Sequence, residues 1–435
     1  MDSRSSSSYV HGNTAKKSTP IVLLLLATTC LISLQWSYKH EIRLERLERQ
    51  PGADEDTSTH PPHSTTTTTA TTSPTFGNTK GQEQSTTTPT KEWCRTPEEY
   101  NKGQWVYNNS IDLLPPYHSE PDPVWGPWCT RLQQQYHESG YQSQFLPDFL
   151  RYKWQPHDCE LANHQWDRAE FCERLKGKTI GVMGDSMSQQ FVHSLMGYTR
   201  GTIESHDKFL AVPNQVWEGK PDYWIKIRVP LCPQNNNDNN NKNGSNGTTL
   251  VFQRWDMYQG KEQDRAALTA LIEESDYLVL NWGVHYQMWS DMEKATDDFV
   301  GLLEELWHPP HKKPERLFWR STNVAHANCA SATSPLTNLQ SSSNTSFTDA
   351  TKSVILEKYN TQEILWQDAY IVKPRILSKL PKTTFLQIEE TTLLRPDGHR
   401  VEGFKGQEDC LHYCEPGPVD HWTELFYHHV VALGI

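Results

Sequence analysis

A serine, a histidine and an aspartate in this chain have the types and spacing that acyl transfer requires. Ser186 stands in the stretch "TIGVMGDSMSQQF" (179–191), where an apolar run is followed by Gly-Asp-Ser and a helix-forming segment. Asp409 and His412 are three residues apart near the C-terminus. In a helical or turn-like stretch, a carboxylate at this spacing can hydrogen-bond the histidine ring and fix its tautomer. The histidine would then be the base that activates the serine hydroxyl.

The Gly-Asp-Ser corner also has a structural interpretation. Ser and Asp are favoured N-cap residues, so Ser186 or Asp185 could simply begin the following helix. On the tripeptide alone the cap is the stronger interpretation, because three-residue matches occur often by chance. The position of Ser186 supports the catalytic hypothesis, because it directly follows a predicted strand and ligands bind outside the carboxyl ends of parallel strands. Backbone N–H groups at the helix N-terminus could also donate to a developing oxyanion.

Cys410 and Cys414 flank His412 and have two interpretations. Disulfides there would hold Asp409 and His412 rigidly. Alternatively, Cys410, His412, Cys414 and His421 could bind zinc. Disulfides are favoured, because paired cysteines in an oxidising compartment usually become disulfides. The Ser-His-Asp chemistry itself implies no metal and no bound cofactor.

The elements that position these residues belong to the C-terminal part of the 435-residue chain. We expect a cytoplasmic tail over residues 1–20, a transmembrane signal anchor over 21–38, a disordered Ser/Thr-rich stem over 39–90 and a luminal catalytic domain over 91–435. A formal net charge of −12 argues against nucleic acid as a partner, because binding to phosphates needs clustered Lys and Arg. A neutral substrate fits better, and the oligomeric state stays open.

The composition beyond the predicted anchor indicates an oxidising secretory lumen. Eight of the nine cysteines follow the apolar run, an even number that fits a disulfide set. Four Asn-x-Ser/Thr sequons lie on the same side, at Asn108, Asn243, Asn246 and Asn344. The Thr-rich tract 57–90 resembles an O-glycosylated stalk. Because short spans tend to sort to thinner membranes, we expect a type II protein of the Golgi or endoplasmic reticulum, with the Golgi as our prediction.

From residue 178 onward, strands and helices alternate, which is typical of a parallel sheet with helices on its faces. The expected strands are 179–183, 224–229, 249–255, 277–281, 316–321 and 384–388. Residues 291–307 carry apolar side chains at helical spacing and predict an amphipathic helix. Residues 93–154 are rich in aromatics, Pro and Cys, and they predict a smaller, loop-rich lobe held by disulfides.

Six ordered segments between about residues 93 and 427 resemble the plant trichome birefringence-like (PC-esterase) polysaccharide O-acetyltransferases. They are "GQWVY" (103–107), "RYKWQPHDCEL" (151–161), "GDS" (184–186), "FWRSTNVAH" (318–326), "RPDGH" (395–399) and "DCLHYCEPGPVDHW" (409–422). The resemblance implies a Golgi-anchored α/β protein of the SGNH-hydrolase type that transfers acetyl groups to cell-wall polysaccharides. By motif it places the nucleophile on Ser186, the base on His412 and the orienting acid on Asp409.

The chain departs from the family pattern near these residues. The family usually has Leu, Ser, Arg and Asn after Gly-Asp-Ser, whereas this chain has Met187, Ser188, Gln189 and Gln190. The usual Asn after the last Trp is Thr423. These departures leave the acceptor open, and a relative outside land plants with a different glycan acceptor is our hypothesis.

Further candidates for oxyanion or substrate binding lie at strand ends: Gly184, Asp185, Asn281, Gly283 and Arg320. Asn281 and Gly283 end a predicted strand at the same sheet edge as Ser186, so their polar groups could complete an oxyanion hole. Arg320 closes another strand and would either contact donor or acceptor or make structural hydrogen bonds to backbone carbonyls.

The function predicted from these features is O-acetyl transfer to a polysaccharide through an acetyl-serine intermediate. The acetyl donor is a co-substrate, for which acetyl-CoA is one candidate. The same triad would serve a carbohydrate acetyl esterase if water replaced the sugar. A glycan-binding protein without catalysis is the alternative of another class, and the presence of all three triad residues argues against it.

Overall fold

The computed structural model describes residues 92–109, 147–162, 166–199, 226–232, 247–286, 288–336, 365–402 and 408–435. All of them belong to the larger of the two units into which the chain divides, Ser85–Ile435. The predicted tail, anchor and stem (1–90) lie outside the described residues. Among the residues that are described, no helix has the length and hydropathy needed to cross a membrane.

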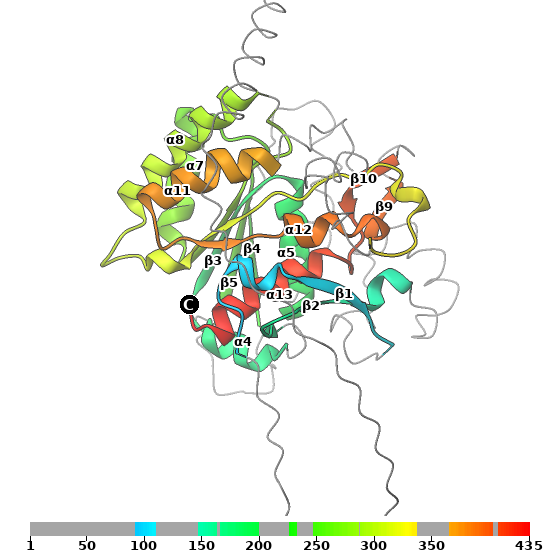
Figure 1. The fold of residues 1–435 in the computed structure, drawn as a ribbon. Coiled ribbons are helices and arrows are strands. Elements are labelled where there is room, and N and C mark those ends of the chain that lie inside the picture. The colour runs from blue at the N-terminus through cyan, green and yellow to red at the C-terminus, as the bar shows by residue number, and fades with distance from the viewer. Residues whose placement is uncertain are drawn as a thin grey trace, which may run out of the picture. The chain divides into compact units, whose positions relative to one another are not determined.

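A six-stranded sheet lies at the centre of this unit, in the order β4-β5-β3-β6-β7-β8 (Figure 1). Its strands are β3 (Thr179–Gly184), β4 (Lys226–Leu231), β5 (Thr248–Arg254), β6 (Tyr277–Asn281), β7 (Leu317–Arg320) and β8 (Thr384–Leu386). Each of the six predicted strands is confirmed, with its ends shifted by at most two residues. The central strands β3 and β6 are almost wholly buried, as expected for strands covered on both faces.

The edge strand β4 differs from the all-parallel sheet expected from the sequence. It pairs antiparallel with β5, whereas the other neighbouring pairs are parallel. Parallel neighbours need a crossover connection, usually a helix. The sequence between β4 and β5 is an Asn-rich stretch without helical periodicity, so direct antiparallel pairing is the simpler connection.

Helices cover both faces of the sheet. The α-helices are α2 (Pro97–Tyr100), α4 (Arg168–Arg174), α5 (Ser186–Thr199), α7 (Glu262–Glu274), α8 (Trp289–Leu306), α11 (Lys373–Lys379), α12 (Glu389–Leu393) and α13 (Val419–Tyr427). The π-helical segments are η10 (Gln367–Val372) and η13 (His428–Ala432), and the 3₁₀ turns are η5 (Asp148–Arg151), η7 (Pro314–Arg316), η8 (Cys329–Ser331) and η11 (Pro396–Gly398). The helix predicted over 291–307 is α8.

The alternation of side chains along β3 divides the core into two layers. Val182 packs in one apolar cluster with Phe191 of α5 and Phe426 of α13. Met183, the next residue, packs in the other cluster with Phe299 of α8. Figure 1 shows the corresponding arrangement, with α7, α8 and α11 grouped on one side of the sheet and α5 and α13 on the other.

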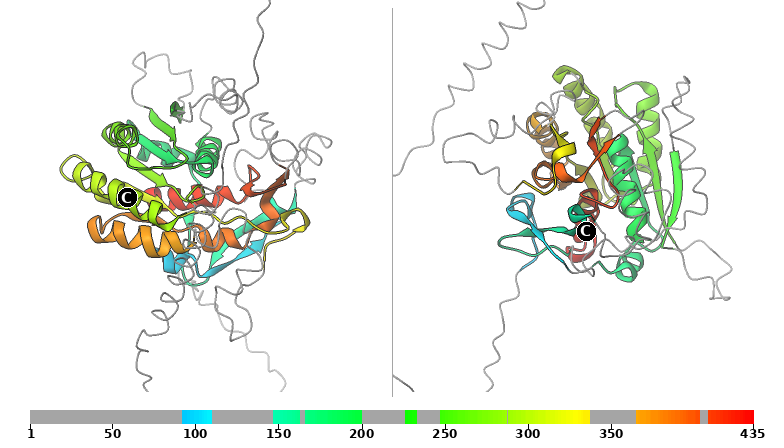
Figure 2. Two further views of the ribbon diagram at one scale, coloured as in Figure 1. Left: turned by 90° about the horizontal axis from the view of Figure 1, so that it is seen from above. Right: turned by 90° about the vertical axis from the view of Figure 1, so that its right-hand side faces the viewer.

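Two small antiparallel ribbons flank the main sheet. The first joins β1 (Gly103–Tyr107) to β2 (Tyr152–Pro156), and the Cys94–Cys159 disulfide links the segment before β1 to the segment after β2. In Figure 2 this ribbon lies beside α13. A buried ion pair between Lys153 of β2 and Glu424 of α13 connects the two. The second joins β9 (His399–Glu402) to β10 (Glu408–Tyr413). The smaller lobe predicted over 93–154 is therefore partly a β-ribbon, and residues 110–146 of it lie outside the described residues.

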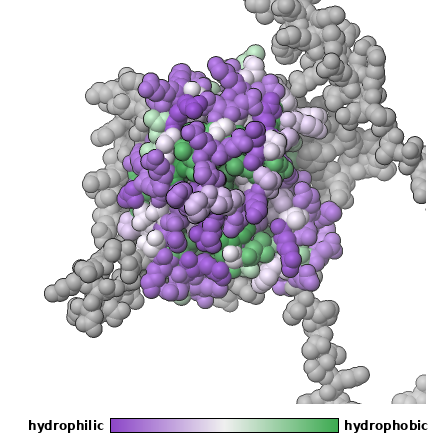
Figure 3. Space-filling view, turned by 90° about the vertical axis from the view of Figure 1, so that its left-hand side faces the viewer, coloured by the Kyte–Doolittle hydropathy of each residue, from purple (hydrophilic) through white to green (hydrophobic). Residues whose placement is uncertain are grey.

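The face of the molecule in Figure 3 is mainly hydrophilic, with small hydrophobic patches separated by polar side chains. The exposed large hydrophobic residues of the described part are scattered along the chain: Trp93, Tyr107, Met288, Tyr370 and Leu377. Scattered exposed apolar residues are normal on soluble domains.

Candidate active site

The Gly-Asp-Ser corner joins the carboxyl end of β3 to the first residue of α5. Asp185 is the cap of this helix, because its Oδ1 accepts a hydrogen bond of 2.9 Å from the N–H of Met187. Ser186 is the first helical residue and is partly exposed. Position 184 requires glycine, because a Cβ there would lie 2.2 Å from the Oγ of Ser188 and 2.3 Å from the carbonyl oxygen of Asn281. The cap role thus falls on Asp185, and the hydroxyl of Ser186 remains available for chemistry.

His412 bridges Ser186 and Asp409. Its Nε2 lies 2.8 Å from the Oγ of Ser186, and its Nδ1 lies 3.0 Å from each carboxylate oxygen of Asp409. An Nδ1–H donated to the carboxylate leaves the Nε2 lone pair facing the serine hydroxyl, which is the tautomer a general base needs. The structure therefore brings Ser186 to a histidine and an aspartate that lie more than two hundred positions further along the sequence.

Asp409 and His412 lie on the strand β10 and not in the helical or turn-like stretch that their spacing suggested. The pairing of β10 with β9 is irregular between Asp409 and Tyr413. Within this irregularity the Oδ1 of Asp409 accepts the backbone N–H groups of Leu411 (3.3 Å) and His412 (3.1 Å). The carboxylate therefore holds both the ring and the backbone of the histidine.

Side chains from other elements hold further backbone groups of this strand. Nδ1 of His399 donates to the carbonyl oxygen of His412 (3.0 Å). The amide of Gln190 donates to the carbonyl oxygen of Tyr413 (2.7 Å) and accepts from its N–H (3.1 Å). Asn323 donates to the carbonyl oxygen of Leu411. Because Gln190 belongs to α5, it ties the helix of Ser186 directly to the strand of His412.

Disulfides support the same strand. Cys410 is joined to Cys329, and Cys414 is also disulfide-bonded. The pair Cys172–Cys232 is a further disulfide of the described part. With their thiols used in this way, Cys410 and Cys414 are not available as the zinc ligands that the sequence had left as an alternative.

The electrostatics of the site keep Asp409 ionised. Burial by itself raises the pKa of this carboxyl, but the positive charge that His412 can carry and the hydrogen bonds from its ring and backbone outweigh burial. The pKa of Asp409 is consequently held well below its ordinary value. The side chains of His412 and Asp409 are 24% and 15% exposed, so the base can be reached from solvent.

Asn281 and Arg320 are buried beside the Gly-Asp-Ser corner, where Asn281 pairs in register with Gly184 and Arg320 contacts Ser188. The Nδ2 of Asn281 donates to the carbonyl oxygen of Arg320 (2.8 Å) and to Thr322 Oγ1 (2.9 Å), which uses both of its amide hydrogens. Arg320 is fully buried and donates to Asn281 Oδ1, Ser188 Oγ and the carbonyl oxygen of Ser321. These contacts favour a structural role for Arg320, as a source of internal hydrogen bonds, over contact with the acetyl donor or the acceptor sugar.

Gly283 is also a packing residue in this arrangement. A Cβ at position 283 would lie 2.2 Å from Thr322 Oγ1, so the close approach of these two loops requires glycine. Of the backbone donors at the corner, the N–H of Met187 is occupied by the carboxylate of Asp185. The N–H of Ser186 belongs to the first helical turn, whose N–H groups have no intrahelical acceptor, and it is the best remaining donor for an oxyanion.

Sequence reasoning did not single out His399, Asn323, or the pairing of Gln190 with Tyr413. His399 and Asn323 stand within the quoted family segments, but nothing in a linear pattern indicates that their side chains meet the backbone of His412. A sequence can point to such residues only where a polar side chain stands at a position predicted to be buried. Buried polar groups are nearly always hydrogen-bonded, so such a residue is expected to have a structural partner.

Comparison with known proteins finds one matching family and several relatives. Residues 307–429, which include Asp409 and His412, match the family described as "PC-Esterase: GDSL/SGNH-like Acyl-Esterase family found in Pmr5 and Cas1p". The chain is 22% identical to the Arabidopsis thaliana protein trichome birefringence-like 1, over 76% of this chain and 60% of that protein. It is 23% identical to trichome birefringence-like 40 of the same plant, over 75% and 85%. It is also 22% identical to xyloglucan O-acetyltransferase 4 of Populus trichocarpa, over 64% and 70%. These similarities confirm the resemblance stated from the sequence.

Proposed function

We propose that this chain, a relative of the PC-esterase and trichome birefringence-like proteins, is a polysaccharide O-acetyltransferase that works through an acetyl-serine intermediate. The observation that carries the proposal is the position of His412, whose two ring nitrogens lie 2.8 Å from the Ser186 hydroxyl and 3.0 Å from the Asp409 carboxylate. A histidine placed in this way can move a proton to and from serine while the carboxylate stabilises the imidazolium.

In the first half-reaction Ser186 Oγ attacks the carbonyl carbon of an acetyl donor, and His412 Nε2 takes the hydroxyl proton. The tetrahedral oxyanion forms at the N-terminus of α5, where the helix dipole and the N–H of Ser186 stabilise negative charge. The intermediate collapses to acetyl-Ser186 as the donor's leaving group departs with the proton held by His412.

In the second half-reaction a glycan hydroxyl gives its proton to His412 Nε2 and attacks the acetyl carbonyl. Collapse of the second tetrahedral intermediate forms the glycan ester, and the proton returns from His412 to Ser186 Oγ. The acceptor class is inferred from the related xyloglucan O-acetyltransferase, whose printed name refers to a polysaccharide.

An acetyl esterase is the second candidate, and the acyl-esterase description of the matching family favours it. His412 is 24% exposed, so water can also approach the base. Esterase and transferase share the first half-reaction and differ only in whether water or a sugar hydroxyl attacks acetyl-Ser186.

We place the enzyme in the Golgi membrane as a type II protein with a luminal catalytic domain. The three disulfides between described residues support an oxidising compartment. The anchor over 21–38 rests on the sequence alone.

The test is to incubate the purified full-length protein with p-nitrophenyl acetate, with and without neutral oligosaccharides. Acetyl groups recovered on the oligosaccharide establish the transferase, and free acetate alone establishes the esterase. If the wild type and Ser186→Ala release nitrophenol at the same rate, the proposal is wrong and a binding protein becomes the better interpretation.

A further inference from the structure

We propose that Gln189, Arg254 and Asp256 form the subsite that binds the acceptor sugar beside Ser186. This inference rests on the proposed function, because it assigns the binding place of the molecule whose hydroxyl receives the acetyl group.

The sheet register brings these residues to the reacting serine. β5 is the direct neighbour of β3, and Gly184 pairs in register with Arg254, the last residue of β5. Ser186 follows Gly184 by two positions at the same edge. Gln189 stands three residues after Ser186 and therefore shares its face of α5. The side chains of Arg254 and Gln189 meet, because Nη1 of the arginine donates to Oε1 of the glutamine at 3.1 Å.

The chemistry of this group suits a neutral polyol. Nε and Nη2 of Arg254 donate to the two carboxylate oxygens of Asp256, at 2.9 and 3.5 Å. The paired charges cancel, so the site does not favour a phosphate as an unpaired arginine would. The contacts use three of the five N–H groups of Arg254, and within the described part of the chain the other two have no partner. With spare lone pairs on Asp256, the group offers donors and acceptors in a fixed planar array, which is what adjacent sugar hydroxyls require.

The group is accessible but held in place from the interior. The side chains of Arg254 and Asp256 are 18% and 24% exposed, and Gln189 is also partly exposed. On its inner side the amide of Gln189 lies 3.5 Å from Nε2 of His193, whose Nδ1 contacts the buried carboxylate of Glu415 at 3.0 Å. Polar groups fixed in this way bind a ligand at a smaller entropic cost.

The test separates the two half-reactions in the purified full-length protein. The burst of nitrophenol from p-nitrophenyl acetate reports acetylation of Ser186, and a xyloglucan oligosaccharide is the acceptor probe. Arg254→Ala is expected to raise the KM for the oligosaccharide about tenfold or more, since charge-assisted hydrogen bonds are lost, while the effect on the burst is small. Arg254→Lys, which keeps the charge but not the planar fork, should recover part of the loss.

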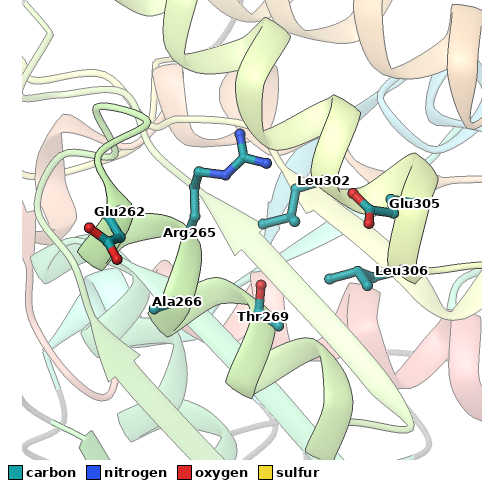
Figure 4. Close-up of a pocket in the computed structure, with 7 residues that line it drawn as sticks. All are labelled: Glu262, Arg265, Ala266, Thr269, Leu302, Glu305 and Leu306. Atoms are coloured by element: carbon teal, nitrogen blue, oxygen red, sulfur yellow. The ribbon is translucent and has the colours of Figure 1, made fainter.

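The matched control is Arg265→Ala. Arg265 of α7 also pairs with an aspartate, Asp298, at 2.7 Å, but its side chain lies in a groove of about 560 Å³ between α7 and α8 (Figure 4). Its removal should leave both half-reactions unchanged.

The outcomes are distinct. An unchanged oligosaccharide KM in Arg254→Ala with a normal burst overturns the subsite and leaves the proposed function intact. A reduced burst with an unchanged KM would assign Arg254 to the donor and also overturns it. If the wild type only hydrolyses, the same KM comparison is made with an acetylated xyloglucan oligosaccharide as substrate. A wild type that never acetylates Ser186 refutes the proposed function, and the subsite with it.

Discussion

Replacing Gln190 by Ala should slow acetylation of Ser186 and also lower the free energy of unfolding by a small amount. The side chain of Gln190 is buried, and its amide makes two hydrogen bonds to the backbone of Tyr413, the residue after His412. In Gln190→Ala the carbonyl oxygen of Tyr413 keeps its contact with Nε of Arg400 at 3.0 Å. Its N–H loses the partner, and a buried N–H without one costs about 1–3 kcal/mol.

The effect on rate follows from geometry. The 2.8 Å contact between His412 and Ser186 joins α5 to β10, and Gln190 is the side chain that connects the same two elements beside it. A displacement of about 1 Å between reacting groups can cost about a hundredfold in rate. We therefore expect the nitrophenol burst rate to fall about ten- to a hundredfold, with a loss of about 2 kcal/mol in the free energy of unfolding.

The assay compares burst kinetics and urea unfolding in Gln190→Ala and in Gln155→Ala, where the glutamine is exposed on β2. Gln155→Ala should match the wild type in both. A burst rate in Gln190→Ala within about twofold of the wild type would refute the reasoning that this amide positions His412.

Three further predictions follow from the site and its supports. Asp409→Asn should keep the fold but lower the rate of acetyl-Ser186 formation by about 10⁴, because the asparagine favours the wrong tautomer of His412; a loss below tenfold would contradict this role. Cys329→Ser opens the disulfide to Cys410, which closes a separation of 81 residues, and should lower the unfolding free energy in urea by about 4 kcal/mol; an unchanged urea midpoint would contradict it. Burial lowers the pKa of His326 to about 4, so the unfolded chain binds a proton near the ordinary histidine pKa while the folded chain does not. The contribution of His326 to stability should therefore fall as pH drops from about 7 toward 4. Burial raises the pKa of Glu389 to about 8, which has the opposite effect in the same range, so the test compares the wild type with His326→Gln. The urea midpoint should fall more between about pH 7 and pH 4 in the wild type than in the variant, and equal changes in the two proteins would contradict the assignment.

The sheet and the corner of Ser186 were predictable because their signals are local. Buried parallel strands such as β3 and β6 are short apolar runs, and they alternate with segments of helical periodicity such as α8. The same alternation places the turn after β3 at the carboxyl edge of the sheet. The direction of β4 was not predictable from its own residues, because it depends on the connection to β5.

The surroundings of the triad were less predictable because they depend on contacts between distant segments. The spacing of Asp409 and His412 fits a helix, yet the pair lies on an irregular strand whose backbone is held by side chains of α5 and β9. Asn281 and Arg320 stand at the expected strand ends, but both are buried, and their side chains hydrogen-bond each other instead of facing a substrate. A sequence gives the positions of polar residues along the chain, whereas tertiary packing decides which of them face solvent.

Peptide mass spectrometry of Ser186 after brief incubation with p-nitrophenyl acetate tests the central claim most directly. The proposed mechanism predicts one acetyl group on Ser186 in the wild type, and none on this peptide in His412→Ala at the same time point. An unmodified Ser186 in a wild type that still turns over the donor, or equal acetylation in both proteins, would contradict the role assigned to Ser186, His412 and Asp409.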